Sequence, residues 1–195
     1  MKKTGFFLLE AFRCVIVTAM VLTLGVFILR YGHQRYYSAV YPTQYTDDVT
    51  AAAKEFGIAP SLIYAVIHTE SSFDPQVTSS ANAKGLMQIT DETFEWALDR
   101  AGEQGKHPPE DLYDPSVNIH YGVYILTLLG EQFDNTETTL AAYNAGIGRV
   151  SEWLKDPAHS ADGVHLDAIP YHETAEYVKR VLDAQKIYQQ LYNIQ

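Results

Sequence analysis

The chain has 195 residues, of which 47% are hydrophobic and 19% are charged, a composition typical of a folded protein and not of a disordered one. This length accommodates one domain with a short appendage and is sufficient to bury a core. The formal net charge of −10 argues against nucleic acid as a partner.

The N-terminal segment carries a long uncharged run. No charged residue occurs from Val15 to Leu29, and a helix over this run can cross a bilayer if Arg13 reaches the membrane interface. Lys2, Lys3 and Arg13 precede the run, which predicts a cytoplasmic N-terminus and an exported remainder. A cleaved signal peptide is the alternative. Because no small-residue cleavage site follows the run, we expect a retained anchor.

These observations divide the chain into three parts. We assign residues 1–30 to a cytoplasmic tip and a transmembrane anchor, residues 31–45 to a linker, and residues 46–195 to an exported domain. The part beyond the anchor holds 10 basic and 23 acidic residues, a net charge of −13. Such a domain will not adsorb generally to anionic polymers, so substrate affinity is expected to come from a local cleft. Cys14, the single cysteine, lies in the anchor, so the exported part has no disulfide.

The exported part is predicted to be all-α, with about seven helices and no convincing run of strand residues. Thr46 is expected to cap the first helix and Gly57 to end it, while Pro60 begins the second, where its missing N–H does no harm. Residues 103–113 and 155–168 are expected to be loops. The predicted helices are Thr46–Phe56, Pro60–Glu70, Asp91 to near Gly102, Asp114–Phe133, Thr136–Tyr143, Val150–Leu154 and about His172–Tyr192. The central helix is expected to bury Ile119, Val123, Leu126, Leu129 and Phe133.

Glu70 stands at the end of the second predicted helix, where the periodicity calls for a core hydrophobe. Ile63, Val66, Ile67 and Glu70 follow i, i+3, i+4, i+7 spacing and share one helix face. Burial on that face favours the neutral carboxyl and raises its pKa, which suits a general acid that works near neutral pH. The alternative is a helix-end glutamate that turns into water.

Four separated segments contain further residues of chemical interest. They read ESSFDP from Glu70, GLMQ from Gly85, AYNAG from Ala142 and IPYHETAEYV from Ile169. Each segment is a weak signal alone, but all four, in this order and over more than a hundred residues, resemble the soluble lytic transglycosylase family. The resemblance covers roughly residues 52–191. It implies an all-α, goose-type-lysozyme-like domain that acts on bacterial peptidoglycan.

The resemblance implies that Glu70 is the catalytic acid and base. Glu70 would protonate the glycosidic oxygen between N-acetylmuramic acid and N-acetylglucosamine. It would then take the proton of the muramic acid C6 hydroxyl as that oxygen closes on C1, which leaves a 1,6-anhydro end. Most glycosidases use two carboxylates, whereas in this family the N-acetyl group of the substrate is understood to replace the second. Asp74, Asp91 and Glu92 are better explained by turns and helix starts, so no nucleophile is evident.

The other substrate-binding residues are also implied by the resemblance. Ser79 would orient the N-acetyl group, unless it is a loop serine bonded to backbone. Met87 and Gln88 would line the cleft, unless Met87 fills core. Glu173 and Tyr177, four residues apart on the last helix, would face the same cleft. The complete set is Ser79, Met87, Gln88, Tyr143, Asn144, Glu173 and Tyr177.

Two more of these residues have plain alternatives. Asn144 is either a sugar-binding amide or a helix C-cap, and Glu173 is either a substrate contact or a first-turn helix acid. Large aromatic side chains elsewhere are expected in the core and not as sugar platforms. They are Phe73, Trp96, Tyr113 and Trp153.

No cofactor or metal is expected, because the seven histidines lack ligand spacing and no glycine-rich phosphate loop is present. We expect a membrane-anchored lytic transglycosylase whose catalytic domain lies outside the cytoplasm, on the cell-wall side or in the periplasm. Its partners are then peptidoglycan glycan strands and the membrane. The alternatives are a lysozyme-type muramidase that hydrolyses the same bond and a non-catalytic peptidoglycan-binding module.

Overall fold

The computed structural model describes residues 2–194, apart from the side chains of residues 2–11 and 14. The side chains of Lys2, Lys3 and Cys14, on which sequence inferences were based, therefore lie outside the described part. Within that part the chain forms helices and two isolated β-bridges but no strand, which confirms the all-α fold class. The chain divides into two compact units, Met1–Pro42 and Thr43–Gln195.

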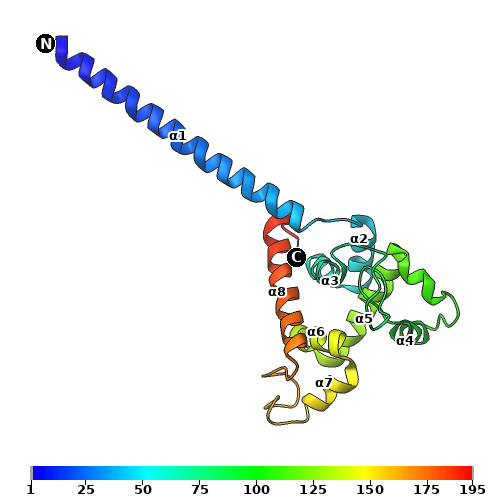
Figure 1. Ribbon diagram of the computed structural model, residues 1–195. Coiled ribbons are helices and arrows are strands. Elements are labelled where there is room, and N and C mark those ends of the chain that lie inside the picture. Colours follow the sequence, from blue (N-terminus) through cyan, green and yellow to red (C-terminus); the bar gives the residue numbers. More distant parts are fainter. Residues whose placement is uncertain (1, 195) are drawn as a thin grey trace. The chain divides into compact units, whose positions relative to one another are not determined.

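The first unit is one long helix, α1 (Lys2–Val40), drawn in blue in Figure 1. Within its stretch Val15–Val40, an 18-residue window has a mean hydropathy of 2.0, and the stretch is long and apolar enough to cross a membrane, by length and composition. The helix also includes most of the segment expected to be a linker. Stacked tyrosines four residues apart, Tyr37 and Tyr41, accompany its last turn, and Pro42 then disfavours helical backbone at the residue before it.

The second unit contains the seven predicted α-helices and one 3₁₀ helix that the sequence did not predict (Figure 1). The 3₁₀ helix occupies the end of the expected loop at 103–113, where two consecutive prolines precede an acidic turn. The remaining differences are confined to helix ends. The elements are α2 (Thr46–Phe56), α3 (Pro60–Ser71), α4 (Asp91–Ala101), η1 (Pro109–Tyr113), α5 (Pro115–Phe133), α6 (Thr136–Ala145), α7 (Ile147–Trp153) and α8 (His172–Tyr192).

Side-chain caps explain where several helices begin. The Asp114 carboxylate accepts the Ser116 backbone N–H at 2.8 Å at the start of α5, and Asn135 caps α6 in the same way. The expected cap at Thr46 is wrong, because Tyr45 takes the N-cap position with left-handed backbone and no side-chain bond. The Thr46 hydroxyl instead accepts a hydrogen bond from Tyr64 at 3.3 Å, which ties α2 to α3.

The core of the second unit forms where α3 packs against α8, α2 packs against α5, and α5 packs against α6. All five apolar positions predicted on the buried face of α5 are buried. On α3, Ile63, Val66 and Ile67 are fully buried. The face of α3 that ends in Glu70 is therefore a core face, as its periodicity predicted.

Candidate active site

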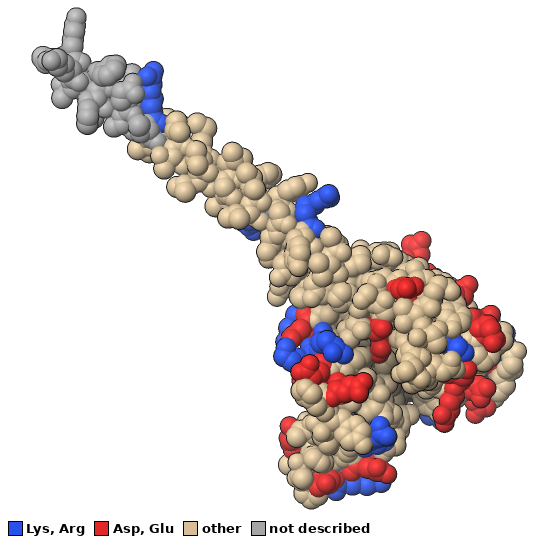
Figure 2. Space-filling view, viewed as in Figure 1, with Lys and Arg blue, Asp and Glu red and all other residues tan. Residues whose placement is uncertain are grey.

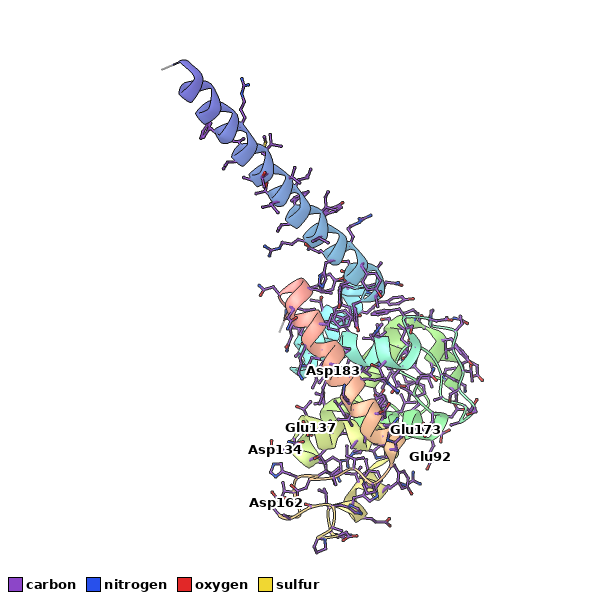
Figure 3. The ribbon with its side chains drawn as sticks, turned by 60° about the vertical axis from the view of Figure 1, so that its left-hand side comes forward. Glu92, Asp134, Glu137, Asp162, Glu173 and Asp183 are labelled. Carbon is purple, nitrogen blue, oxygen red and sulfur yellow. The ribbon has the colours of Figure 1, made fainter. Side chains whose placement is uncertain are left out.

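A cleft of about 660 Å³ opens in the second unit. The loop between α3 and α4 forms one part of its lining, and the last turn of α3, α4, α5, α6, the start of α7 and the first turn of α8 form the rest. Among the lining residues there are three glutamates and no Lys, Arg or His side chain, so the cleft offers no cation for an anionic ligand. Two of these glutamates, Glu92 on α4 and Glu173 on α8, are labelled in Figure 3 and are exposed.

The third glutamate is Glu70, in the last turn of α3. Burial raises the pKa of its carboxyl to about 7, while the Tyr177 hydroxyl and the Arg180 guanidinium act in the opposite direction and lower it. Its side chain is partly exposed, so the carboxyl still lines the cleft. Near neutral pH this group can therefore either give or take a proton.

Two tyrosines accompany the Glu70 carboxyl, one from α6 and one from α8. Burial, with the nearby charge of Glu70, raises the pKa of Tyr143 and Tyr177 well above the usual range, so both phenols keep their protons. The Tyr143 hydroxyl donates to the Met87 carbonyl at 2.7 Å. The Tyr177 hydroxyl is buried and makes no hydrogen bond within ordinary geometric limits to any described residue, although it is close enough to lower the pKa of Glu70. The Tyr177 hydroxyl is therefore positioned to act on the Glu70 carboxyl.

Ser79 enters the cleft from the loop between α3 and α4. Its hydroxyl oxygen accepts the backbone N–H groups of Ala81 at 3.2 Å and Ala83 at 3.1 Å. The oxygen is therefore fixed by backbone, while the hydroxyl proton is available to donate to an acceptor in the cleft.

Gln88 lies on the same loop and has left-handed backbone, with φ 49°, an uncommon conformation for a residue other than glycine. Its amide nitrogen donates to the Val77 carbonyl at 3.1 Å and to the Gly85 carbonyl at 2.9 Å. Because both partners are acceptors, the nitrogen must be the atom that faces them. The amide oxygen is then the atom that Gln88 can offer to a ligand.

The loop that carries Ser79 and Gln88 is held by an ion pair between a buried lysine and a partly exposed aspartate. Lys84 is only 8% exposed, and its ammonium group pairs with the Asp91 carboxylate, which also accepts a hydrogen bond from Asn82 at 3.0 Å. Asp91 is therefore more than a first-turn helix acid. It connects the start of α4 to the loop.

Residues 47–165 match the family described as "Transglycosylase SLT domain", a span of more than half of the chain. The chain belongs to this family.

Named relatives agree with this assignment. The soluble lytic murein transglycosylase of Escherichia coli K12 is 37% identical over 144 residues, which cover 73% of this chain and 22% of that protein. The membrane-bound lytic murein transglycosylase C of Actinobacillus pleuropneumoniae serotype 5b is 32% identical over 166 residues, which cover 74% of this chain and 46% of that protein. The chain thus matches only a part of each of these two relatives.

Solved structures show the same SLT fold. An inactive mutant of the lytic transglycosylase Slt from Pseudomonas aeruginosa has a TM-score of 0.70 and 33% identity, over 85% of this chain and 29% of that one. The 70-kDa soluble lytic transglycosylase of Escherichia coli has a TM-score of 0.70 and 32% identity, over 79% of this chain and 25% of that one, and has also been solved in complex with bulgecin A.

The SLT domain brings most of the predicted site residues to one cleft. Tyr177 is only 2% exposed and lies next to Glu70, behind the lining. Asn144 is exposed and does not cap α6, because Gly146 holds the C-cap position. The predicted residues that line the cleft are Glu70, Ser79, Gln88, Tyr143, Asn144 and Glu173.

The prediction that Met87 lines the cleft is wrong. Its side chain is fully buried and lies against Gly122 of α5, so it fills core. What Met87 contributes to the site is its backbone, whose carbonyl holds the Tyr143 hydroxyl.

The expectation that Trp96 is a core residue is also wrong, because Trp96 is partly exposed and lines the cleft. The guanidinium of Arg100 lies 5.9 Å from its ring centroid. The signal that could have revealed it is the pattern of α4, whose buried face is made of Phe94, Ala97 and Leu98. Helical spacing places Trp96 on another face.

Acidic side chains are visible across the surface of the second unit in Figure 2, in keeping with its negative charge. Among the described residues, no group of three or more His, Cys, Asp or Glu side chains is arranged to hold a metal ion. The cleft of the SLT domain thus offers a titrating carboxyl, hydroxyl and amide groups, and an indole ring. With three carboxylates and no cation in its lining, the cleft disfavours an anionic ligand, and its hydroxyl and amide groups suit a hydroxyl-rich one.

Proposed function

We propose that this protein is a peptidoglycan lytic transglycosylase that cleaves the β-1,4 bond between N-acetylmuramic acid and N-acetylglucosamine and leaves 1,6-anhydro ends. The observation that carries the proposal is the raised pKa of Glu70. Its carboxyl lines the cleft of an SLT domain, and burial raises its pKa to about 7. The relatives named lytic murein transglycosylases support the substrate class.

The proposed reaction uses one carboxyl twice. Protonated Glu70 donates its proton to the glycosidic oxygen as the bond from that oxygen to C1 breaks, and the N-acetyl group of the substrate stabilises the positive charge at C1. The Glu70 carboxylate then takes the proton of the C6 hydroxyl as that oxygen bonds to C1. No water is consumed, and Glu70 ends protonated as it began. A pKa near the working pH suits a group that acts as acid and then as base.

The neighbouring side chains fit this sequence of steps. The Tyr177 hydroxyl can donate to the Glu70 carboxylate and stabilise it while Glu70 is ionised, between the two proton transfers. The Ser79 hydroxyl can donate a hydrogen bond to the carbonyl of the N-acetyl group, which fixes that group below C1. We infer that Gln88, Asn144 and Glu173 bind sugar hydroxyl or amide groups along the cleft.

We further propose that residues 1–30 are a retained membrane anchor, that residues 31–45 connect it to the domain, and that residues 46–195 are the catalytic domain outside the cytoplasm. The apolar stretch within α1 supports the membrane span by length and composition. One relative is named membrane-bound lytic murein transglycosylase C. The matched family region begins at residue 47, close to the proposed start of the domain.

The product end decides between this proposal and its alternatives. The full chain in detergent would be incubated with purified peptidoglycan, and the released muropeptides would be weighed by mass spectrometry. We expect 1,6-anhydro ends, which are lighter by one water than reducing ends, and no release by the Glu70→Gln variant. Reducing ends would show a lysozyme-type muramidase. Binding to peptidoglycan without release would show a non-catalytic module.

A further inference from the structure

The backbone of one residue beside the cleft, Met87, is held from both sides by side chains of two different helices. The backbone N–H of Met87 donates to the Asn118 side-chain oxygen on α5 at 2.7 Å. The backbone carbonyl of Met87 accepts from the Tyr143 hydroxyl on α6, also at 2.7 Å. Both polar groups of this residue are thus fixed by side chains more than thirty residues away in sequence.

Asn118 itself has no exposed surface and uses its whole amide group. Its nitrogen donates to the Lys84 carbonyl at 2.9 Å and to the Leu112 carbonyl at 2.8 Å, while its oxygen accepts from Met87. A buried amide satisfied in this way holds its partners in one arrangement, and removing it leaves several buried polar groups unpaired.

Two glycines let α5 and the loop approach each other this closely. Gly85 has φ +74°, and a Cβ there would lie 2.1 Å from the Leu112 carbonyl oxygen and 2.3 Å from the Asn118 nitrogen. Gly122, one turn after Asn118 on α5, leaves the space that the Met87 side chain fills, since a Cβ there would lie 2.4 Å from the Met87 sulfur. Consecutive turns of α5 therefore hold the backbone and the side chain of Met87.

We propose that Asn118, which does not line the cleft, is a positioning residue for the active site. It acts through Met87 on two residues that do line the cleft. Gln88 is the next residue in the chain and has left-handed backbone, so a displacement of Met87 also displaces Gln88. Tyr143 is tied to the Met87 carbonyl and lies near the Glu70 carboxyl. This inference rests on the proposed function.

The test uses Asn118→Asp, a change of nearly the same size. The new carboxyl can still accept the Met87 N–H but turns an oxygen toward the carbonyls of Lys84 and Leu112. We expect kcat/KM for muropeptide release, per folded molecule and below the unfolding temperature, to fall by about 100-fold, the scale of a 1 Å misplacement in a site. Both kcat and KM should change, because Tyr143 and Gln88 serve different parts of the cleft.

Val49→Ala is the matched control. Val49 is fully buried on α2 and lies outside the cleft lining, so its truncation should lower stability through a cavity that is not part of the cleft. If Asn118→Asp fails to fold, Gly122→Ala takes its place in the comparison. Gly122 lies on the same helix as Asn118, and a methyl group there displaces the Met87 side chain.

The outcomes separate the two proposals. A large loss of kcat/KM in the Asn118 or Gly122 variant, with the Val49 variant within about twofold of wild type, supports positioning. Equal kcat/KM in all folded variants overturns the inference and leaves the proposed function intact. A wild-type chain that releases no fragments overturns the proposed function and the inference with it.

Discussion

The hydroxyl of Tyr177 is buried beside the carboxyl of Glu70 and has no hydrogen-bond partner elsewhere among the described residues. An unpaired buried hydroxyl is costly, and such groups in native proteins call for an explanation. The cost is offset if the Tyr177 hydroxyl donates a hydrogen bond to the ionised form of Glu70. That form is the one that must exist between the two proton transfers of the proposed reaction.

Replacement of Tyr177 by Phe tests this relationship. The hydroxyl lowers the pKa of Glu70, so its removal should raise that pKa above about 7. The alkaline fall in kcat/KM, where Glu70 loses its proton, should then move to higher pH. The maximal rate should fall about tenfold or more, because the carboxylate loses a hydrogen bond in the step that forms it.

Tyr188→Phe is the matched control for this prediction. It also removes a hydroxyl from a fully buried tyrosine of α8, but eleven residues along the helix, about 16 Å from Tyr177. Activity measured against pH for both variants decides the matter. An alkaline limb in Tyr177→Phe that coincides with that of wild type would contradict the role given to the hydroxyl.

Glu70→Gln should also change stability, and in a direction that depends on pH. The folded-state pKa of about 7 lies above the ordinary value of 4.5. The stability associated with the neutral carboxyl is therefore fully present below about pH 4.5 and is lost as the pH rises through 7. At pH 8 the wild type carries a buried charge that costs about 3 kcal/mol, and the variant does not.

We therefore expect the Gln variant to be more stable than wild type at pH 8, by up to about 3 kcal/mol, and the difference to shrink at pH 5. Denaturant unfolding followed by tryptophan fluorescence measures this, since Trp96 and Trp153, the only tryptophans, both lie in the second unit. Glu173→Gln, a change at an exposed cleft carboxylate, is the control and should show no such pH dependence. Equal stabilities of wild type and the Glu70 variant at pH 8 would mean that Glu70 is not buried as described.

Trp96 should contribute to substrate binding more than to folding. Its ring lines the cleft and is partly exposed, and an indole offers a flat apolar surface to a sugar ring. Trp96→Ala should raise KM for peptidoglycan fragments by about tenfold, the effect of about 1.4 kcal/mol, with a small change in unfolding temperature. Trp153→Ala, in the core, should instead lower the unfolding temperature and leave KM little changed. An unchanged KM in Trp96→Ala would remove this residue from the site.

The sequence predicted the helices of the second unit well because their ends carry local signals. Gly57 and Gly102 take left-handed C-cap positions, and Asp114 caps α5, all features that depend on a few neighbouring residues. Thr46 shows the limit of this reasoning. A threonine before an acidic turn resembles an N-cap, but its hydroxyl is used by Tyr64, which is distant in sequence.

The candidate site was predictable where a polar residue interrupts a core pattern, and Glu70 is such a residue. Asn118 carries the same signal, because Asn118, Gly122, Ile125 and Leu129 follow the spacing of one helix face. The place of Met87 was not predictable, since an apolar residue in a loop can equally face a cleft or the core. The buried position of its side chain depends on the space left by Gly122, thirty-five residues further along the chain.

The anchor is the last feature open to a direct test. A retained α1 should leave the mature chain with its full mass of 21.9 kDa, and alkaline carbonate should not extract the protein from membranes, because a spanning helix is held by its apolar length. Removal of a signal peptide would instead shorten the chain by its first 15–30 residues. Intact mass of the purified protein separates the two.

Replacing Val21 and Leu22, near the middle of the uncharged run, with Arg should release the chain from the membrane if the helix spans the bilayer, because a charge at its centre costs about 2.5–3.5 kcal/mol. A double Arg variant that stays in the membrane at full mass would contradict the spanning helix.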